Sequence, residues 1–168
     1  MSTTNMEKCK ISKNTLCSRM LIETPSIWIC PASTQNLDVT IKNTYKGEYC
    51  WALNGTKAGE NKFNNMRKGD ICIFGNLKDG YNYYGTVKEK QILLESESLM
   101  WPFQSKSGTI WKHKFVVEDI KICNISPEKA RHFRGWTKEE QRWQTQIMLK
   151  RGEGYEEFYS FITSLKDK

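Results

Sequence analysis

Short runs of β-branched and aromatic residues alternate with polar, glycine-containing turns along residues 26–122. Such runs favour strands, because these side chains pack well on a pleated surface and turn residues end each run. Pro31 is expected to end the first run, and the polar segment at 32–38 is expected to be a loop. The turns at 68–70 and 78–80 predict a hairpin. The predicted strands cover residues 26–30, 47–51, 71–74, 83–87 with a continuation at 91–94, and 114–122.

A helical period replaces this pattern at residues 58–67, where Phe63 and Met66 fall on one face. Ser126-Pro127 is typical of a helix start, with serine as the cap and proline in the first turn. The segment 137–140 is a capping box, which predicts a helix that also contains Trp143 and Ile147 one turn apart. A final core-facing stripe is predicted at Phe158, Phe161, Ile162 and Leu165.

Strands in the middle of the chain and helices at its end predict an α+β domain, a curled or barrel-like sheet with helices packed on it. The chain has 168 residues, a length that suits a single domain. We expect an N-terminal arm at 1–22 and one domain at 23–168. No apolar run is long enough for a membrane span and no secretory signal is evident, so we expect an intracellular protein, cytoplasmic or nuclear, without membrane contact.

The chain carries 26 basic and 19 acidic side chains, a net charge of +7. This balance favours a polyanionic partner, although charge alone does not separate nucleic acid from a membrane surface. The six cysteines form no C-x-x-C pair and there are only two histidines, so neither a metal nor another cofactor is expected. In an intracellular chain such cysteines are expected to stay reduced.

Sequence signatures of enzymes are missing: there is no Walker loop, no G-x-S-x-G, no H-E-x-x-H and no zinc-deaminase motif. We therefore expect a binding protein with no catalytic residue. One rival is an enzyme that acts on a flipped base with Cys50 or Cys72 as nucleophile. Another is a methyl-lysine reader, since aromatic cages also hold cations. A protein of charge +7 suits that cationic ligand poorly.

Three tryptophans, Trp51, Trp101 and Trp111, stand next to polar, glycine-containing loops. Buried indoles usually need a partner for their N–H, so they are either core residues or flat walls of a pocket. Basic residues lie among aromatic ones at 111–114 and 131–136, a pattern typical of a groove that follows phosphates while rings stack on bases. A solvated basic face is the alternative for each cluster.

Several segments resemble YTH domains. Residues 48–63 are similar to the family's segment from a cage tryptophan through an N-x-K helix, and 70–75 with 83–85 resemble its strand, turn and F-x-G strand. Residues 114–119 resemble the strand that follows. Lys68-Gly-Asp70 and Leu99-Met-Trp-Pro102 are more typical of EVE domains, the prokaryotic branch of the same PUA-like superfamily, whose members occur in modification-dependent restriction systems.

The resemblance implies a PUA-like fold that flips N6-methyladenine, most simply on RNA, into a cage of Trp51, Trp101 and Trp111. The EVE-type alternative reads 6-methyladenine or 5-methylcytosine in DNA for a restriction system. Either reader could be fused to an effector protein or recruit one. The resemblance further implies base-edge contacts from Asn36, Asp38, Ser33 and Ala52, and phosphate contacts from Lys112, Arg134, Lys150 and Arg151.

Overall fold

One mixed sheet organises the computed structural model, which describes residues 24–37, 49–53, 55–76, 78–94, 111–133, 147–149 and 154–165. The strands are β1 (Ile27–Pro31), β2 (Tyr49–Leu53), β3 (Ile71–Asn76), β4 (Gly80–Ile92), β5 (His113–Ile125) and β6 (Ile147–Leu149). They lie in the order β2-β5-β4-β3-β1-β6, with β1 parallel to β3 and the other pairs antiparallel. The helices with assigned bounds are α2 (Lys57–Asn65), α3 (Pro127–Phe133) and α4 (Tyr155–Ser164).

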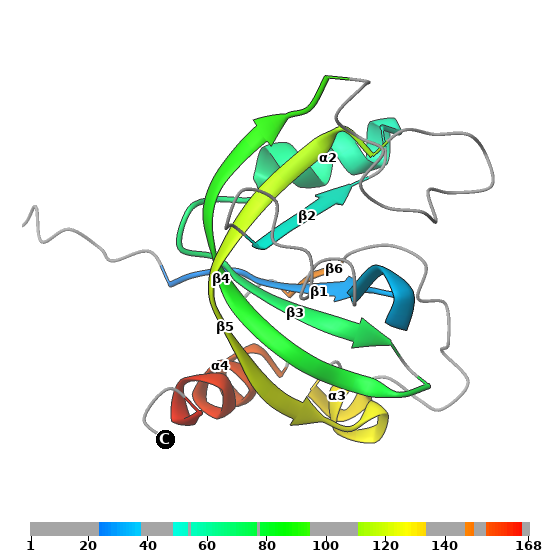
Figure 1. Cartoon of the computed structure of the whole chain (residues 1–168). Helices are drawn as coiled ribbons and strands as arrows, with labels where there is room; N and C mark the ends of the chain where they lie inside the picture. The colour runs from blue at the N-terminus through cyan, green and yellow to red at the C-terminus, as the bar shows by residue number, and fades with distance from the viewer. Residues whose placement is uncertain are drawn as a thin grey trace, which may run out of the picture.

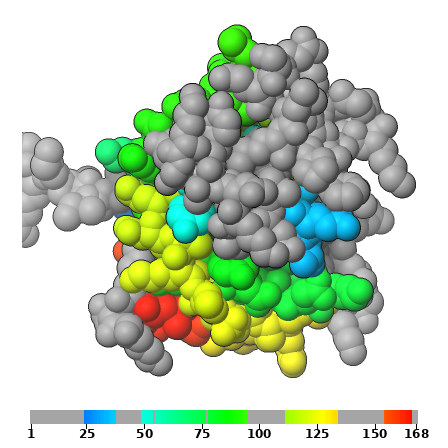
Figure 2. Space-filling model, in the orientation of Figure 1, coloured from blue at the N-terminus to red at the C-terminus, as the bar shows by residue number. Residues whose placement is uncertain are grey.

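The sheet curls because β4 and β5, each 13 residues long, arc around the molecule (Figure 1). Their pairing shifts register at Tyr81/Tyr83, Tyr84/Thr86 and Val87/Glu89, and such irregularities bend and twist a strand. The helix α2 and the strand β2 lie within the upper half of this arc, and α3 and α4 lie at its lower end (Figure 1). The space-filling view shows β5, α3 and α4 at the surface along that lower end (Figure 2). The predicted α+β class with a curled sheet is confirmed.

Alternate residues of β1 enter two separate apolar clusters on opposite faces of the sheet. Ile27 and Ile29 join the cluster that α3 and α4 cover, whereas Trp28 and Cys30 join the cluster that includes residues of α2 and β2. This follows from the two-residue period of a strand. Both faces are covered, so every residue from Ile27 to Cys30 is buried, which explains the uninterrupted apolar run in the sequence.

Most predicted elements are confirmed within a few residues. The expected helix at 58–67 is α2, with Phe63 and Met66 buried, and the hairpin is the β3–β4 pair. Ser126 caps α3 by accepting a hydrogen bond from Lys129 N at 3.1 Å. In the last helix Phe158 and Ile162 are buried. No helix of the described residues is long and apolar enough to cross a membrane.

The expected loop at 32–38 is wrong in part, because residues 34–37 form a helical turn. Ser33 stands at its start. The Ser33 Oγ accepts a hydrogen bond from Asn36 N at 3.2 Å, and the Ser33 carbonyl accepts one from Leu37 N at 3.0 Å. Serine is among the preferred residues for such a cap, a local signal that a reading based on polarity alone overlooks.

The expected helix through Ile147 is also wrong at that residue, because Ile147–Leu149 is strand β6. It pairs antiparallel with β1, with Ile29 opposite Ile147 and Ile27 opposite Leu149. Without this pairing one edge of β1 would leave a row of backbone donors and acceptors unmatched. The partner lies about 120 residues earlier in the sequence, so the local i, i+4 spacing carries no information about it.

Asp70 connects the start of β1 to the turn before β3 through side-chain hydrogen bonds. Its Oδ1 accepts from Ser26 N at 2.9 Å, and its Oδ2 accepts from Trp28 Nε1 at 2.8 Å and from Arg67 N at 2.9 Å. The side chain is buried, with 3% of its surface exposed. Bonds to an ionised acceptor are stronger than neutral ones, so this carboxylate sets the register in which β1 enters the sheet.

Candidate base-binding site

The structure brings together two of the three predicted cage tryptophans. Trp51 lies on β2 opposite Phe115 of β5, and Trp111 stands two residues before β5 begins. The backbone at Trp111 is held because Leu93 N donates to Lys112 O at 2.7 Å. The two indole rings lie 6.2 Å apart between centroids, with an angle of 51° between their planes. They therefore form two sides of a corner and not a parallel sandwich.

Trp51 is also a core residue. Its ring meets Phe74 edge-on with 5.6 Å between centroids, and only 2% of Trp51 is exposed, whereas Trp111 is half-buried. Of the two interpretations that the sequence left open for Trp51, the core one is correct. A role as a pocket wall is compatible with it, since the Trp111 side of the corner is the more accessible one. Trp101 lies outside the described residues.

Asn36 places a buried amide next to residues of the apolar cluster that contains Trp51. It is 4% exposed, and among the described residues its Oδ1 has no hydrogen-bond donor. Leu37, the next residue in the chain, and Ala32, four residues earlier, belong to the same apolar cluster as Trp51. A buried acceptor without a donor costs free energy, so this oxygen is suited to a ligand donor. Ser33 is exposed, and its hydroxyl serves the helical turn.

Of the remaining predicted contacts, some lie at positions that suit a ligand and others do not. Ala52 is buried on β2. Among the described strands β2 is an edge strand, so it pairs with β5 on one side only and its other side faces away from the sheet. Lys112 is exposed beside Trp111, as a phosphate contact requires. The Lys112–Lys114 edge was expected to face phosphate, but this is wrong for Lys114, because only 3% of its surface is exposed. Outside the described residues lie Asp38, Arg134, Lys150 and Arg151.

The two candidate nucleophiles, Cys50 and Cys72, do not resemble reactive thiols. Burial raises the pKa of the Cys72 thiol well above its ordinary value, with the neighbouring Cys30 adding to the shift. Cys50 is fully buried. A reactive cysteine needs a lowered pKa and access to its substrate, so the rival interpretation of a cysteine enzyme is disfavoured. Among the described residues there is no group of His, Cys, Asp and Glu that could hold a metal ion.

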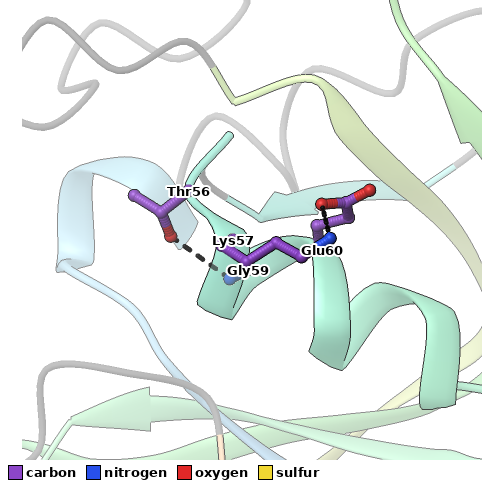
Figure 3. Close-up of polar contacts among 4 residues, drawn as sticks. All are labelled: Thr56, Lys57, Gly59 and Glu60. Atoms are coloured by element: carbon purple, nitrogen blue, oxygen red, sulfur yellow. Dashed lines mark hydrogen bonds and ion pairs between the residues drawn. The ribbon is translucent and has the colours of Figure 1, made fainter.

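The helix α2 flanks the tryptophan corner, a relation that the sequence did not reveal. Phe63 of α2 belongs to the cluster of Trp51 and lies 5.0 Å from the ring of His113, between centroids. At the start of the helix Thr56 Oγ1 accepts from Gly59 N at 3.2 Å, and Lys57 pairs with Glu60 at 2.8 Å (Figure 3).

Comparison with known proteins establishes the fold. No protein-family model matches the chain, and no curated protein matches it. The N-terminal domain of Thermococcus gammatolerans McrB bound to m5C DNA is similar over 83% of this chain and 98% of that domain, with 13% identity and a TM-score of 0.60. Human THYN1 protein in complex with DNA containing 5-methylcytosine has 16% identity over 86% and 99%, with a TM-score of 0.49. The chain shares its fold with the McrB domain, and this likeness supports the predicted curled α+β architecture.

Proposed function

We propose that this chain reads a modified base in DNA, 5-methylcytosine, by taking it out of the helix into the corner formed by Trp51 and Trp111. The pairing of these two indoles, brought from separate segments, is the observation that carries the proposal. The McrB domain that shares the fold is bound to m5C DNA. The EVE-type alternative from the sequence is therefore preferred to N6-methyladenine on RNA, for which neither structural neighbour offers support. The third wall, Trp101, remains part of the proposal.

Cytosine suits the buried amide of Asn36, which we propose to contact the edge of the base. Its exocyclic N4 amino group is a donor, and methylation at C5 leaves this group intact. Asn36 Oδ1 has no donor among the described residues and is proposed to accept from that amino group. The methyl group would lie against the indole faces, where water is excluded. The amide would then recognise the base, and the tryptophans would recognise the modification.

The expected preference for the methylated base is modest. Burying one methyl group contributes about 0.8 kcal/mol. A methyl-sized void left by the unmodified base adds about 1 kcal/mol. The sum, about 1–2 kcal/mol, corresponds to roughly fivefold to thirtyfold tighter binding of the methylated base. Lys112 and the net charge of +7 are proposed to supply an affinity for phosphates that does not depend on methylation.

A titration of four matched oligonucleotides tests the proposal. These are a duplex with one 5-methylcytosine, the unmodified duplex, a duplex with 6-methyladenine, and an RNA with N6-methyladenine, all at one salt concentration. We expect the 5-methylcytosine duplex to bind about fivefold to thirtyfold more tightly than the unmodified one. Equal affinities would overturn the proposal, and tightest binding of the methylated RNA would favour the other interpretation of the sequence.

Variants separate the pocket from general binding. Trp111→Ala should remove the preference for the methylated duplex while leaving binding of the unmodified duplex in place. Tyr159→Ala removes a half-buried ring of α4 and serves as the matched control. It should keep the preference. If Trp111→Ala retained the full preference, the corner would not be the methyl-binding site.

A further inference from the structure

The outward face of α2 carries hydrogen-bond donors along its whole length. Four exposed residues of α2 recur at helical spacing: Lys57, Asn61, Asn64 and Asn65. Lys68 is also exposed and lies in the turn that follows the helix. The opposite face, with Gly59 and Phe63, packs into the core. The two lysines and three asparagines are called the α2 ridge here. The segment 57–68 contains four basic residues against one acidic residue, Glu60.

Helix stability does not explain the composition of the α2 ridge. Asparagine is a poor helix former, because its side chain competes with the helix for backbone hydrogen bonds. Three of the nine residues of α2 are asparagines, and all three face solvent. Amide donors and lysines are, in contrast, side chains that commonly contact phosphate oxygens of nucleic acids. The composition points to a ligand.

The helices α2 and α4 differ in charge, and the ridge belongs to the basic one. The segment 155–165, which contains α4, carries Glu156 and Glu157 and no basic residue. In Figure 1, α2 and α4 lie at opposite ends of the curled sheet. A polyanion would therefore be attracted more strongly to α2 than to α4.

The ridge is continuous with the tryptophan corner. The Phe63 ring of α2 lies 5.0 Å from the His113 ring at the start of β5, between centroids. Trp111 and Lys112 directly precede His113 in the chain. The helix that carries the ridge therefore packs next to the segment that supplies Trp111 and Lys112.

The helix is also held in a fixed position. Lys90 Nζ of β4 donates to Phe63 O at 2.7 Å and lies 4.9 Å from the centroid of the Phe63 ring. Lys62, on the flank of α2, is partly desolvated, which lowers its pKa. A helix tied to the sheet at its carboxyl end presents its donors in a fixed arrangement, so little ordering is needed when a ligand binds.

We propose that the α2 ridge binds the phosphate backbone of the nucleic-acid strand that continues from the flipped base. This inference rests on the proposed function, since the reader supplies the base at the corner. The contacts are to phosphates, so they strengthen binding of methylated and unmodified strands equally. Glu60 weakens them, because its negative charge lies beside the ridge.

The test compares a ridge variant with a control of equal charge change. Lys57→Gln with Lys68→Gln removes two ridge charges. Lys121→Gln with Lys129→Gln removes two exposed charges on β5 and α3. Each lost phosphate contact reduces the slope of log affinity against log salt by about 0.9 on duplex DNA. When the salt concentration rises from 50 to 200 mM, both proteins lose affinity. The factor lost by the ridge variant should be about ten times smaller than the factor lost by the wild type, because the variant lacks two phosphate contacts. The control should match the wild type.

A second variant tests the opposite direction. Glu60→Gln removes the acid beside the ridge and should raise affinity for both duplexes, while Glu156→Gln on α4 should leave it unchanged. If the ridge variant behaves like its control, or Glu60→Gln gives no gain, the ridge proposal is overturned. If the ridge effects appear but wild-type protein does not distinguish methylated from unmodified DNA, the ridge stands and the reader function fails.

Discussion

Replacing Asp70 by alanine should destabilise the fold more than any surface change. The substitution leaves three donors without their acceptor: Ser26 N, Trp28 Nε1 and Arg67 N. Trp28 is 1% exposed, so water cannot replace the carboxylate there, and an unmatched buried donor costs about 1–3 kcal/mol. The other two donors are part-buried and lose about 0.5–1.5 kcal/mol each. We expect a total loss of about 2–6 kcal/mol in the free energy of unfolding.

Urea unfolding followed by far-UV circular dichroism measures this loss, provided that the slope of free energy against denaturant is unchanged. Asp70→Asn keeps one acceptor and should cost less than Asp70→Ala. Asp79→Ala is the control. Asp79 is exposed and accepts from Asn76 Nδ2 at 3.1 Å, so its loss should stay within about 0.5 kcal/mol. The reasoning is refuted if Asp70→Ala and Asp79→Ala unfold at the same urea concentration.

Burial raises the pKa of the Cys123 thiol to about 12 and that of Cys72 well above its usual range. Both thiols should resist alkylation in the folded protein. Because their folded pKa values are raised, the associated stability is present below pH 9 and lost as the pH rises towards 12. Unfolding titrations should show a shallower alkaline loss in Cys123→Ser. Gly80→Ala should lower the free energy of unfolding by about 1–3 kcal/mol more than Gly69→Ala does, as measured by urea unfolding. Both have φ of +91°, but only at Gly80 would a Cβ meet backbone, Ile125 O at 2.7 Å.

The sequence was sufficient to predict the elements whose hydrophobic pattern lies within one short segment of the chain. The apolar run 71–74, the amphipathic segment of α2 and the stripe of α4 each carry their own period, so each was predictable. The strand β6 was not, because its hydrogen bonds are made with β1, far away in the sequence. The burial of Lys114 was missed for a related reason: it depends on what covers that face of β5, which the local sequence pattern does not show.

The candidate site shows the same division. Trp51 and Trp111 were predicted as site residues because they stand next to polar loops, and the structure places their two rings next to each other. The sequence could not show that Trp51 is simultaneously a core residue, because that depends on its contact with Phe74 of β3. The turn residue Asp70 was noticed as part of a motif, whereas its three hydrogen bonds become visible only when β1 and β3 lie side by side.

The central claim, that a methylated base leaves the DNA stack for the tryptophan corner, is tested most directly by 2-aminopurine fluorescence. The probe stands next to a single 5-methylcytosine in a duplex, where stacking quenches it. Wild-type protein should raise the fluorescence on binding, because removal of the neighbouring base unstacks the probe. Trp111→Ala, at concentrations that saturate the duplex, should raise it far less. Saturating wild-type binding with no rise in fluorescence would contradict the account.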